Sequence, residues 1–129
     1  MGAIGSGLPS TAITLAKGED LLDGARAAGH IVLPDEDRTA VLLAAAAPVH
    51  LALSLGWAWA IARATRRPTP GKGLAAGLAV AALDLGVIGR RIEAIAALPQ
   101  PRQWADHAAY GLIVGASLSA GRDRGRGPR

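Results

Sequence analysis

Long apolar stretches separated by short polar loops dominate the pattern of residues along this chain. The clearest stretch runs from Ala40 to Ala62 (AVLLAAAAPVHLALSLGWAWAIA) and has no charged residue over 23 positions. At about 1.5 Å per residue, a helix of this length can cross a hydrocarbon core of about 30 Å. Pro48 lies inside it, and a membrane helix tolerates an internal proline better than a soluble helix does. The pattern therefore predicts a transmembrane helix over residues 40–62.

Three further apolar segments are shorter and lie at residues 2–16, 73–88 and 105–120. The first contains a proline and is predicted as a short helix that either re-enters the membrane or crosses it as a truncated span. The second is interrupted only by Asp84, and the stretch GRRIEAIAAL after it would prolong its helix beyond the bilayer. We expect an all-α fold, a compact bundle of three or four short transmembrane helices with four preferred, in one domain over residues 1–120.

Residues 18–32 show a different pattern, with polar and apolar positions on opposite sides of one helix. The polar side carries Asp23, Arg26 and His30. This arrangement predicts an amphipathic helix at the membrane interface, and the alternative is a soluble helix that covers one end of a bundle. The apolar side is formed by Leu21, Leu22, Ala25, Ala28 and Val32.

Composition supports helices that pack closely in lipid. The chain has 17 Gly, no Phe and no Cys, and half of its residues are apolar. A water-soluble core relies on large side chains, whereas Gly and Ala allow helix backbones to approach each other. Two small-xxx-small steps, Gly73 to Gly77 and Gly111 to Gly115, are predicted to pack two helices of the chain together, and a homo-oligomer through the same faces is the alternative. The absence of cysteine excludes disulfides and thiolate metal sites.

The distribution of charge sets the orientation. The net charge is +4, and the loop from Arg63 to Lys72 holds four basic residues and no acid. Residues 17–38 hold three basic and six acidic side chains, and residues 121–129 form a basic tail that we predict to be disordered. Because basic loops stay inside, we expect a multi-pass protein of the bacterial cytoplasmic membrane with a cytoplasmic C-terminus. The predicted aromatic anchors at the interfaces are Trp57, Trp59 and Trp104.

Asp84 is the one charged residue inside its apolar segment, where an unpartnered carboxylate costs about 2.5 kcal/mol or more. Counted at about 1.5 Å per residue from the cytoplasmic boundary, His50, Asp84 and His107 lie at about the same depth of 18 Å. They are predicted to form one polar layer. It is a structural hydrogen bond that fixes helix register, a path for protons or solutes, or, as the least favoured reading, a metal or catalytic centre.

No motif in the chain supports catalysis or cofactor binding. HExxH, CxxC and GxSxG patterns are absent from the sequence, and GKG at Gly71 lacks the remainder of a phosphate-binding loop. We therefore assign no catalytic, metal or cofactor residue and expect no nucleic-acid partner. The basic tail is better explained by attraction to anionic lipid.

Four stretches carry a family resemblance: GSGLPSTAITLAKGEDLLDGARAAG near the start, PVHLALSLGWAWAIARATRR, AALDLGVIGRR and LPQPRQWADHAAYGLIVG. They resemble small bacterial integral membrane proteins of high-GC genomes that have no assigned activity. The resemblance implies a membrane location and a helical fold, and it implies no site residue. The expected function is a non-enzymatic accessory or self-associating membrane bundle. The alternatives are a proton-coupled or solute-conducting protein and, after that, a membrane-embedded enzyme.

Overall fold

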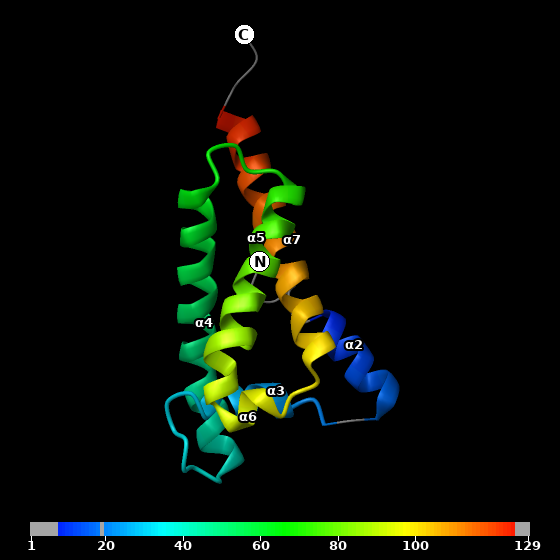
Figure 1. Cartoon of the computed structure of the whole chain (residues 1–129), viewed down its shortest axis with the longest axis vertical. Helices are drawn as coiled ribbons and strands as arrows, with labels where there is room; N and C mark the ends of the chain where they lie inside the picture. Colours follow the sequence, from blue (N-terminus) through cyan, green and yellow to red (C-terminus); the bar gives the residue numbers. More distant parts are fainter. Residues whose placement is uncertain (1–7, 19, 126–129) are drawn as a thin grey trace.

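The computed structural model describes residues 8–18 and 20–125, and all regular structure in that part of the chain is helical. Three long helices, α4, α5 and α7, run alongside one another, α3 and α6 lie at one end of them, and α2 lies against α7 (Figure 1). The elements are α2 (Leu8–Lys17), α3 (Asp23–Gly29), α4 (Thr39–Ala64), α5 (Pro70–Leu83), the π-helical turn η1 (Asp84–Ile88), the 3₁₀ turn η2 (Gly89–Arg91), α6 (Glu93–Ala96) and α7 (Gln100–Gly125).

Helix α4 contains the whole uncharged stretch and continues through Pro48 without a break. Its first half packs against α3, where Gly29 faces the main chain of Leu42. A Cβ atom on Gly29 would lie 2.9 Å from the Leu42 Cα atom, so a side chain there would push the two helices apart. Most of α4 faces outwards, and only 11% of its most apolar 18-residue window is buried within the chain.

Helix α5 begins at a clear start signal. The side chain of Thr69 accepts a hydrogen bond from the Lys72 main-chain N–H at 3.2 Å, and Pro70 occupies the first turn, where its missing N–H is not needed. The helix then widens into η1 at Asp84 and ends at Arg91, because Ile92 takes an extended conformation. The expected prolongation of this helix through GRRIEAIAAL therefore holds as far as Arg91 and is wrong beyond it, where α6 begins as a separate turn.

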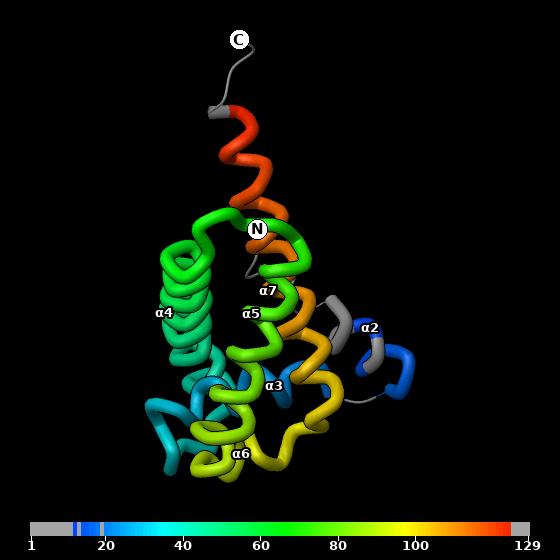
Figure 2. Tube along the Cα trace, turned by 45° about the horizontal axis from the view of Figure 1, so that its top comes forward, coloured from blue at the N-terminus to red at the C-terminus, as the bar shows by residue number. Residues whose placement is uncertain are grey.

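Helices α5 and α7 form the closest pair, and both views of the trace show them side by side (Figures 1 and 2). Four glycines lie at their contact. A Cβ atom on Gly73 would lie 2.7 Å from the Gly115 Cα atom, and one on Gly77 would lie 2.9 Å from the Gly111 Cα atom. The two small-xxx-small steps thus face each other in antiparallel order and bring the two backbones into direct contact.

Helix α7 extends further than the sequence suggested. It continues to Gly125, so residues 121–125 are helical and the prediction of a disordered tail is wrong for them; residues 126–129 lie outside the described part. One physical reason is a tertiary contact, because the Arg122 guanidinium donates a hydrogen bond to the main-chain carbonyl of Arg66 in the α4–α5 loop.

The N-terminal helices are short. Helix α2 has ten residues, about 15 Å, which is too little to cross a bilayer, and residues 2–7 of the predicted segment lie outside the described part. The Thr14 hydroxyl accepts a hydrogen bond from the Arg102 guanidinium at 2.8 Å, which ties α2 to the first turn of α7.

Helix α3 covers seven residues of the predicted amphipathic helix at 18–32. The buried side differs from the predicted one: Ala27 and Gly29 are buried, whereas Leu21 and Leu22 are exposed. The helix begins late because Asp20 accepts a hydrogen bond from the Leu22 main-chain N–H at 2.8 Å and so forms a turn before it. Close approach to α4 then selects the smallest residues for the buried side.

In the described part of the chain, two helices are long and apolar enough to cross a membrane: Thr39–Ala64, and the continuous Pro70–Arg91. Helix α7 has the length but not the hydropathy, and α2 has neither. The expectation of three or four transmembrane helices is therefore not confirmed, while the all-helical fold is.

Candidate functional site

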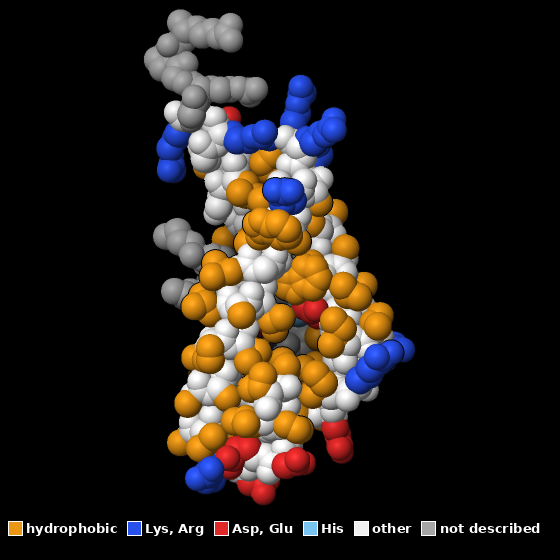
Figure 3. Space-filling view, turned by 90° about the vertical axis from the view of Figure 1, so that its left-hand side faces the viewer, with side chains coloured by type: hydrophobic (Ala, Val, Ile, Leu, Met, Phe, Trp, Pro, Cys, Tyr) orange, Lys and Arg blue, Asp and Glu red, His pale blue; other side chains and the backbone are white. Residues whose placement is uncertain are grey.

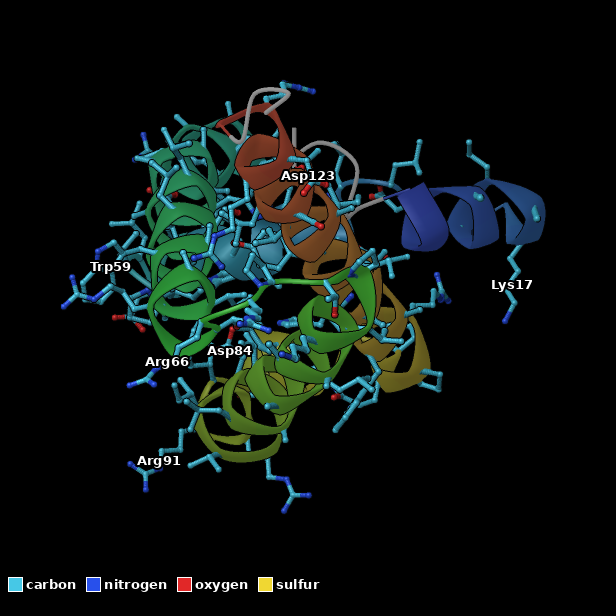
Figure 4. All side chains as sticks on the ribbon, turned by 90° about the horizontal axis from the view of Figure 1, so that it is seen from above. Lys17, Trp59, Arg66, Asp84, Arg91 and Asp123 are labelled. Atoms are coloured by element: carbon cyan, nitrogen blue, oxygen red, sulfur yellow. The ribbon has the colours of Figure 1, made fainter. Side chains whose placement is uncertain are left out.

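The carboxylate of Asp84 lies where the three long helices meet. Asp84 is the first residue of η1, and its side chain is 20% exposed. Figure 4, seen along the bundle, places it between α4 and α5. Its Oδ2 atom accepts a hydrogen bond from Trp57 Nε1 on α4 at 2.9 Å and lies 3.5 Å from His107 Nε2 on α7. One carboxylate oxygen therefore links all three helices.

The second nitrogen of His107 fixes which ring nitrogen carries the hydrogen when the imidazole is neutral. Nδ1 lies 2.8 Å from the main-chain carbonyl oxygen of Gln103, which can only accept, so Nδ1 must carry a hydrogen. In a neutral ring, Nε2 would then present a lone pair to Asp84. A hydrogen bond between Nε2 and Oδ2 needs one further proton, either on the ring or on the carboxyl group. The imidazole and the carboxylate thus lie at the distance where one added proton would complete a hydrogen bond between them.

A π-helical turn positions Asp84. The main-chain N–H of Gly89 donates to the carbonyl of Asp84, five residues back, instead of to a carbonyl four residues back. A Cβ atom on Gly89 would lie 2.7 Å from that carbonyl oxygen and 2.8 Å from the Ile95 side chain, so the turn closes only around a glycine. Single π-turns inside helices occur frequently at functional sites.

A second polar contact fastens α7 to α4 one turn beyond the site. The Tyr110 hydroxyl donates to the main-chain carbonyl of Ser54. Tyr110 also belongs to the buried apolar cluster with Ile61 and Val114, against which Trp57 packs. The Trp57 indole is thus supported by packing on one side and donates to Asp84 on the other.

Of the predicted polar layer, the structure brings Asp84 and His107 together. His50 lies exposed on α4, seven residues before Trp57, and it is Trp57 that α4 presents to the carboxylate. Counting residues missed this, because it assumes that residues equally far along α4 and α5 from their connecting loop lie side by side, whereas Asp84 contacts Trp57, which is nearer to that loop than His50. The seven-residue spacing, which places Trp57 on the same side of α4 as His50, was the available signal.

The other two predicted anchors occupy different surroundings. Trp59 is 65% exposed and carries the Arg63 guanidinium 5.3 Å from its ring centre, a cation–π contact one helical turn apart. Trp104 is 38% exposed near the start of α7. The three tryptophans therefore divide into one that supports the polar site and two on the surface.

Charged side chains gather at the two ends of the bundle, with an apolar band between them (Figure 3). The end with the α4–α5 loop is basic, and the end with α3 carries most of the acids. At the acidic end, the Arg38 guanidinium donates to the Glu36 carboxylate and lowers the pKa of Glu36 to about 2. A hydrogen bond from the Leu22 main chain, with the Arg26 guanidinium, lowers the pKa of Asp20.

Within the described residues, no group of three or more His, Asp or Glu side chains is placed to hold a metal ion. The site thus offers hydrogen-bond and proton chemistry from a carboxylate, an imidazole and an indole. Comparison of the chain with models of protein families, with curated proteins and with solved structures finds no match.

Proposed function

We propose that this protein is a small, non-enzymatic membrane helix bundle of the bacterial cytoplasmic membrane, acting as an accessory or self-associating subunit. The observation that carries the proposal is the outward surface of α4. The most apolar 18-residue window of α4 has a mean hydropathy of 1.8, yet only 11% of that window is buried within the chain. The exposed leucines at 51, 53 and 55 give water no polar partner, whereas lipid tails would cover them without cost.

The contact between α5 and α7 supports α7 as a third helix that crosses the membrane. The two backbones touch from Gly73 and Gly115 to Gly77 and Gly111, so α5 cannot enter a bilayer without taking α7 with it. Two polar side chains of α7 are turned towards neighbouring helices, His107 towards Asp84 and Tyr110 towards the Ser54 carbonyl. Helix α2 would remain beside α7 on one side of the membrane.

The charge of the two ends supports one orientation. The described part of the basic end carries Arg63, Arg66, Arg67 and Lys72, together with two arginines near the end of α7. The described part of the other end carries five acids (Asp20, Asp23, Asp35, Glu36 and Asp37) together with Arg26, Arg38, Arg90 and Arg91. By the tendency of basic loops to remain inside, the α4–α5 loop and the end of α7 would face the cytoplasm, and α3 would face outwards.

Single-cysteine labelling tests the location and the orientation together, because the chain has no cysteine of its own. Asp35→Cys and Gly71→Cys place a thiol at opposite ends, both at exposed positions. We expect both variants to stay in carbonate-washed membranes, with an impermeant maleimide labelling only Asp35→Cys in intact cells. Labelling of Gly71→Cys alone would show that the protein has the opposite orientation. Loss of both variants from the washed membranes would refute the membrane location.

A second candidate function, proton transfer across the bundle, is favoured by the proximity of the Asp84 carboxylate and the His107 imidazole, 3.5 Å apart and both partly exposed. A carboxylate and an imidazole placed together inside a bundle are the side chains that a proton relay requires. In proteoliposomes with a pH gradient, we expect Asp84→Asn to abolish proton flux and Asp106→Asn, an acid beside His107, to preserve it. Equal flux through Asp84→Asn and the parent protein, or no flux through either, would refute this candidate.

A further inference from the structure

A small cavity opens at the basic end of the bundle. It encloses about 230 Å³ between the α4–α5 loop and the last turns of α7. Three of its six lining residues are arginines, one is a serine and one is an acid. They are Arg66, Arg67 and Pro68 from the loop, and Ser119, Arg122 and Asp123 from α7.

Main-chain carbonyls hold the cavity wall in place. The Arg122 guanidinium donates to the carbonyl of Arg66, and Lys72 Nζ donates to the carbonyl of Arg67 at 3.2 Å. Both contacts use the main chain of Arg66 and Arg67, and because the carbonyls are neutral they hold the Arg122 and Lys72 side chains without cancelling their charge. Among the described residues, no carboxylate lies within 4.0 Å of the guanidinium nitrogens of Arg66, Arg67 or Arg122, although Asp123 lines the same cavity.

The cavity lies at the end of the apolar band. Trp59 is exposed on the last turns of α4, with Arg63 stacked on its ring, and the cavity begins three residues further along the chain. Exposed tryptophans with neighbouring arginines are typical of the level at which lipid headgroups begin. Figure 3 shows this transition, with basic side chains directly above the apolar surface.

We propose that this cavity binds the phosphodiester headgroup of an anionic phospholipid of the cytoplasmic leaflet, an inference that rests on the proposed membrane location. Guanidinium groups match phosphate oxygens in planar, two-point geometry, so the three arginines that border the cavity suit such a headgroup, and Ser119 at the same border carries a neutral donor. Basic pockets between helices on the cytoplasmic side are the usual form of such sites.

The lining favours a lipid over free phosphate for two reasons. Asp123 removes part of the positive charge, which disfavours a dianionic phosphate more than a monoanionic phosphodiester. The cavity also lies beside apolar surface, along which acyl chains would lie while the headgroup occupies the arginine site. Free phosphate would gain nothing from that surface.

The chain offers a matched control for the test, because adjacent arginine pairs occur at both ends of α5 and its continuation: Arg66 with Arg67, and Arg90 with Arg91. The full chain in detergent micelles would be titrated with phosphatidylglycerol and, separately, with phosphatidylcholine, and the bound lipid would be measured by native mass spectrometry. The variants are Arg66→Gln/Arg67→Gln and Arg90→Gln/Arg91→Gln, which remove equal charge. Inorganic phosphate would serve as competitor.

We expect the parent protein to retain phosphatidylglycerol in preference to phosphatidylcholine, and Arg66→Gln/Arg67→Gln to bind it about tenfold or more weakly. Arg90→Gln/Arg91→Gln should bind it as the parent does. Equal losses in both variants, no loss in either, or full displacement of the lipid by equimolar phosphate would each overturn the proposal. The carbonate-wash result for the same proteins separates this outcome from failure of the membrane location itself, since a membrane-retained variant without lipid preference contradicts only the headgroup site.

Discussion

The glycine contact between α5 and α7 predicts that a glycine-to-alanine substitution there destabilises the protein. Helix propensity alone would predict the opposite, because alanine is a better helix former than glycine. In Gly111→Ala, the new Cβ atom would lie 2.7 Å from the Gly77 Cα atom and 2.8 Å from the Gly77 nitrogen. Ordinary contacts between such atoms are about 3.5–4.0 Å. Both neighbours are backbone, which cannot rotate away as a side chain can, so the helices must separate by about 1 Å.

The cost follows from that separation. A gap of about 0.5–1 Å removes a quarter to a half of the dispersion energy of each contact, and overpacking of this kind costs about 1–3 kcal/mol. Alanine is favoured over glycine inside a helix by about 1 kcal/mol, which offsets part of the loss. We expect Gly111→Ala to lower the free energy of unfolding by up to about 2 kcal/mol, whereas helix propensity alone would raise it by about 1 kcal/mol.

Gly56→Ala is the control, because nothing lies within 4 Å of the position that its Cβ atom would take in the middle of α4. It should match or exceed the stability of the parent protein. Unfolding in detergent micelles with increasing sodium dodecyl sulfate, followed by far-ultraviolet circular dichroism, measures both variants. The reasoning fails if Gly111→Ala is as stable as Gly56→Ala.

Three further predictions concern other parts of the fold. Tyr110→Phe removes the hydroxyl that donates to a carbonyl of α4 and should lower the free energy of unfolding by about 1 kcal/mol in the same assay; an unchanged value would show that this contact contributes nothing. Gly89→Ala places a Cβ atom 2.7 Å from the carbonyl that closes the π-turn, so it should lower the melting temperature and shift the tryptophan emission, whereas Gly86→Ala, with open space around it, should do neither. Arg38 lowers the pKa of Glu36 to about 2. The stabilisation from this ion pair is therefore fully present above the ordinary pKa of Glu36 and is lost as the pH falls through about 2. An NMR titration of Glu36 should show this, and Arg38→Gln should return the pKa of Glu36 towards 4.5.

The sequence accounts for most of the helices because their signals are local. An uncharged run of 23 residues forms α4, and a threonine cap followed by proline begins α5. Local signals failed where a distant contact decides the outcome. The end of α7 is helical to Gly125, and Arg122 there is held by a carbonyl of the α4–α5 loop, which a disorder prediction from composition cannot include.

The candidate site was predictable in part. An aspartate within an apolar helix requires a partner, which the sequence indicates, and His107 on another apolar segment is a suitable one. The choice of Trp57 over His50 as the partner from α4 could not be read from residue counts, because it depends on the tilt between helices and on the apolar cluster that supports the indole.

The sequence by itself determined the all-helical class, the apolar surface of α4 and the separation of basic from acidic ends, because each depends on residue type and spacing along one segment. Only the tertiary structure decided that the two pairs of glycines face each other in antiparallel order, that η1 turns Asp84 towards α4 and α7, and that three arginines border one cavity. These features join residues far apart in the chain. Their positions follow from how closely the helices approach and how they tilt, which no single segment encodes.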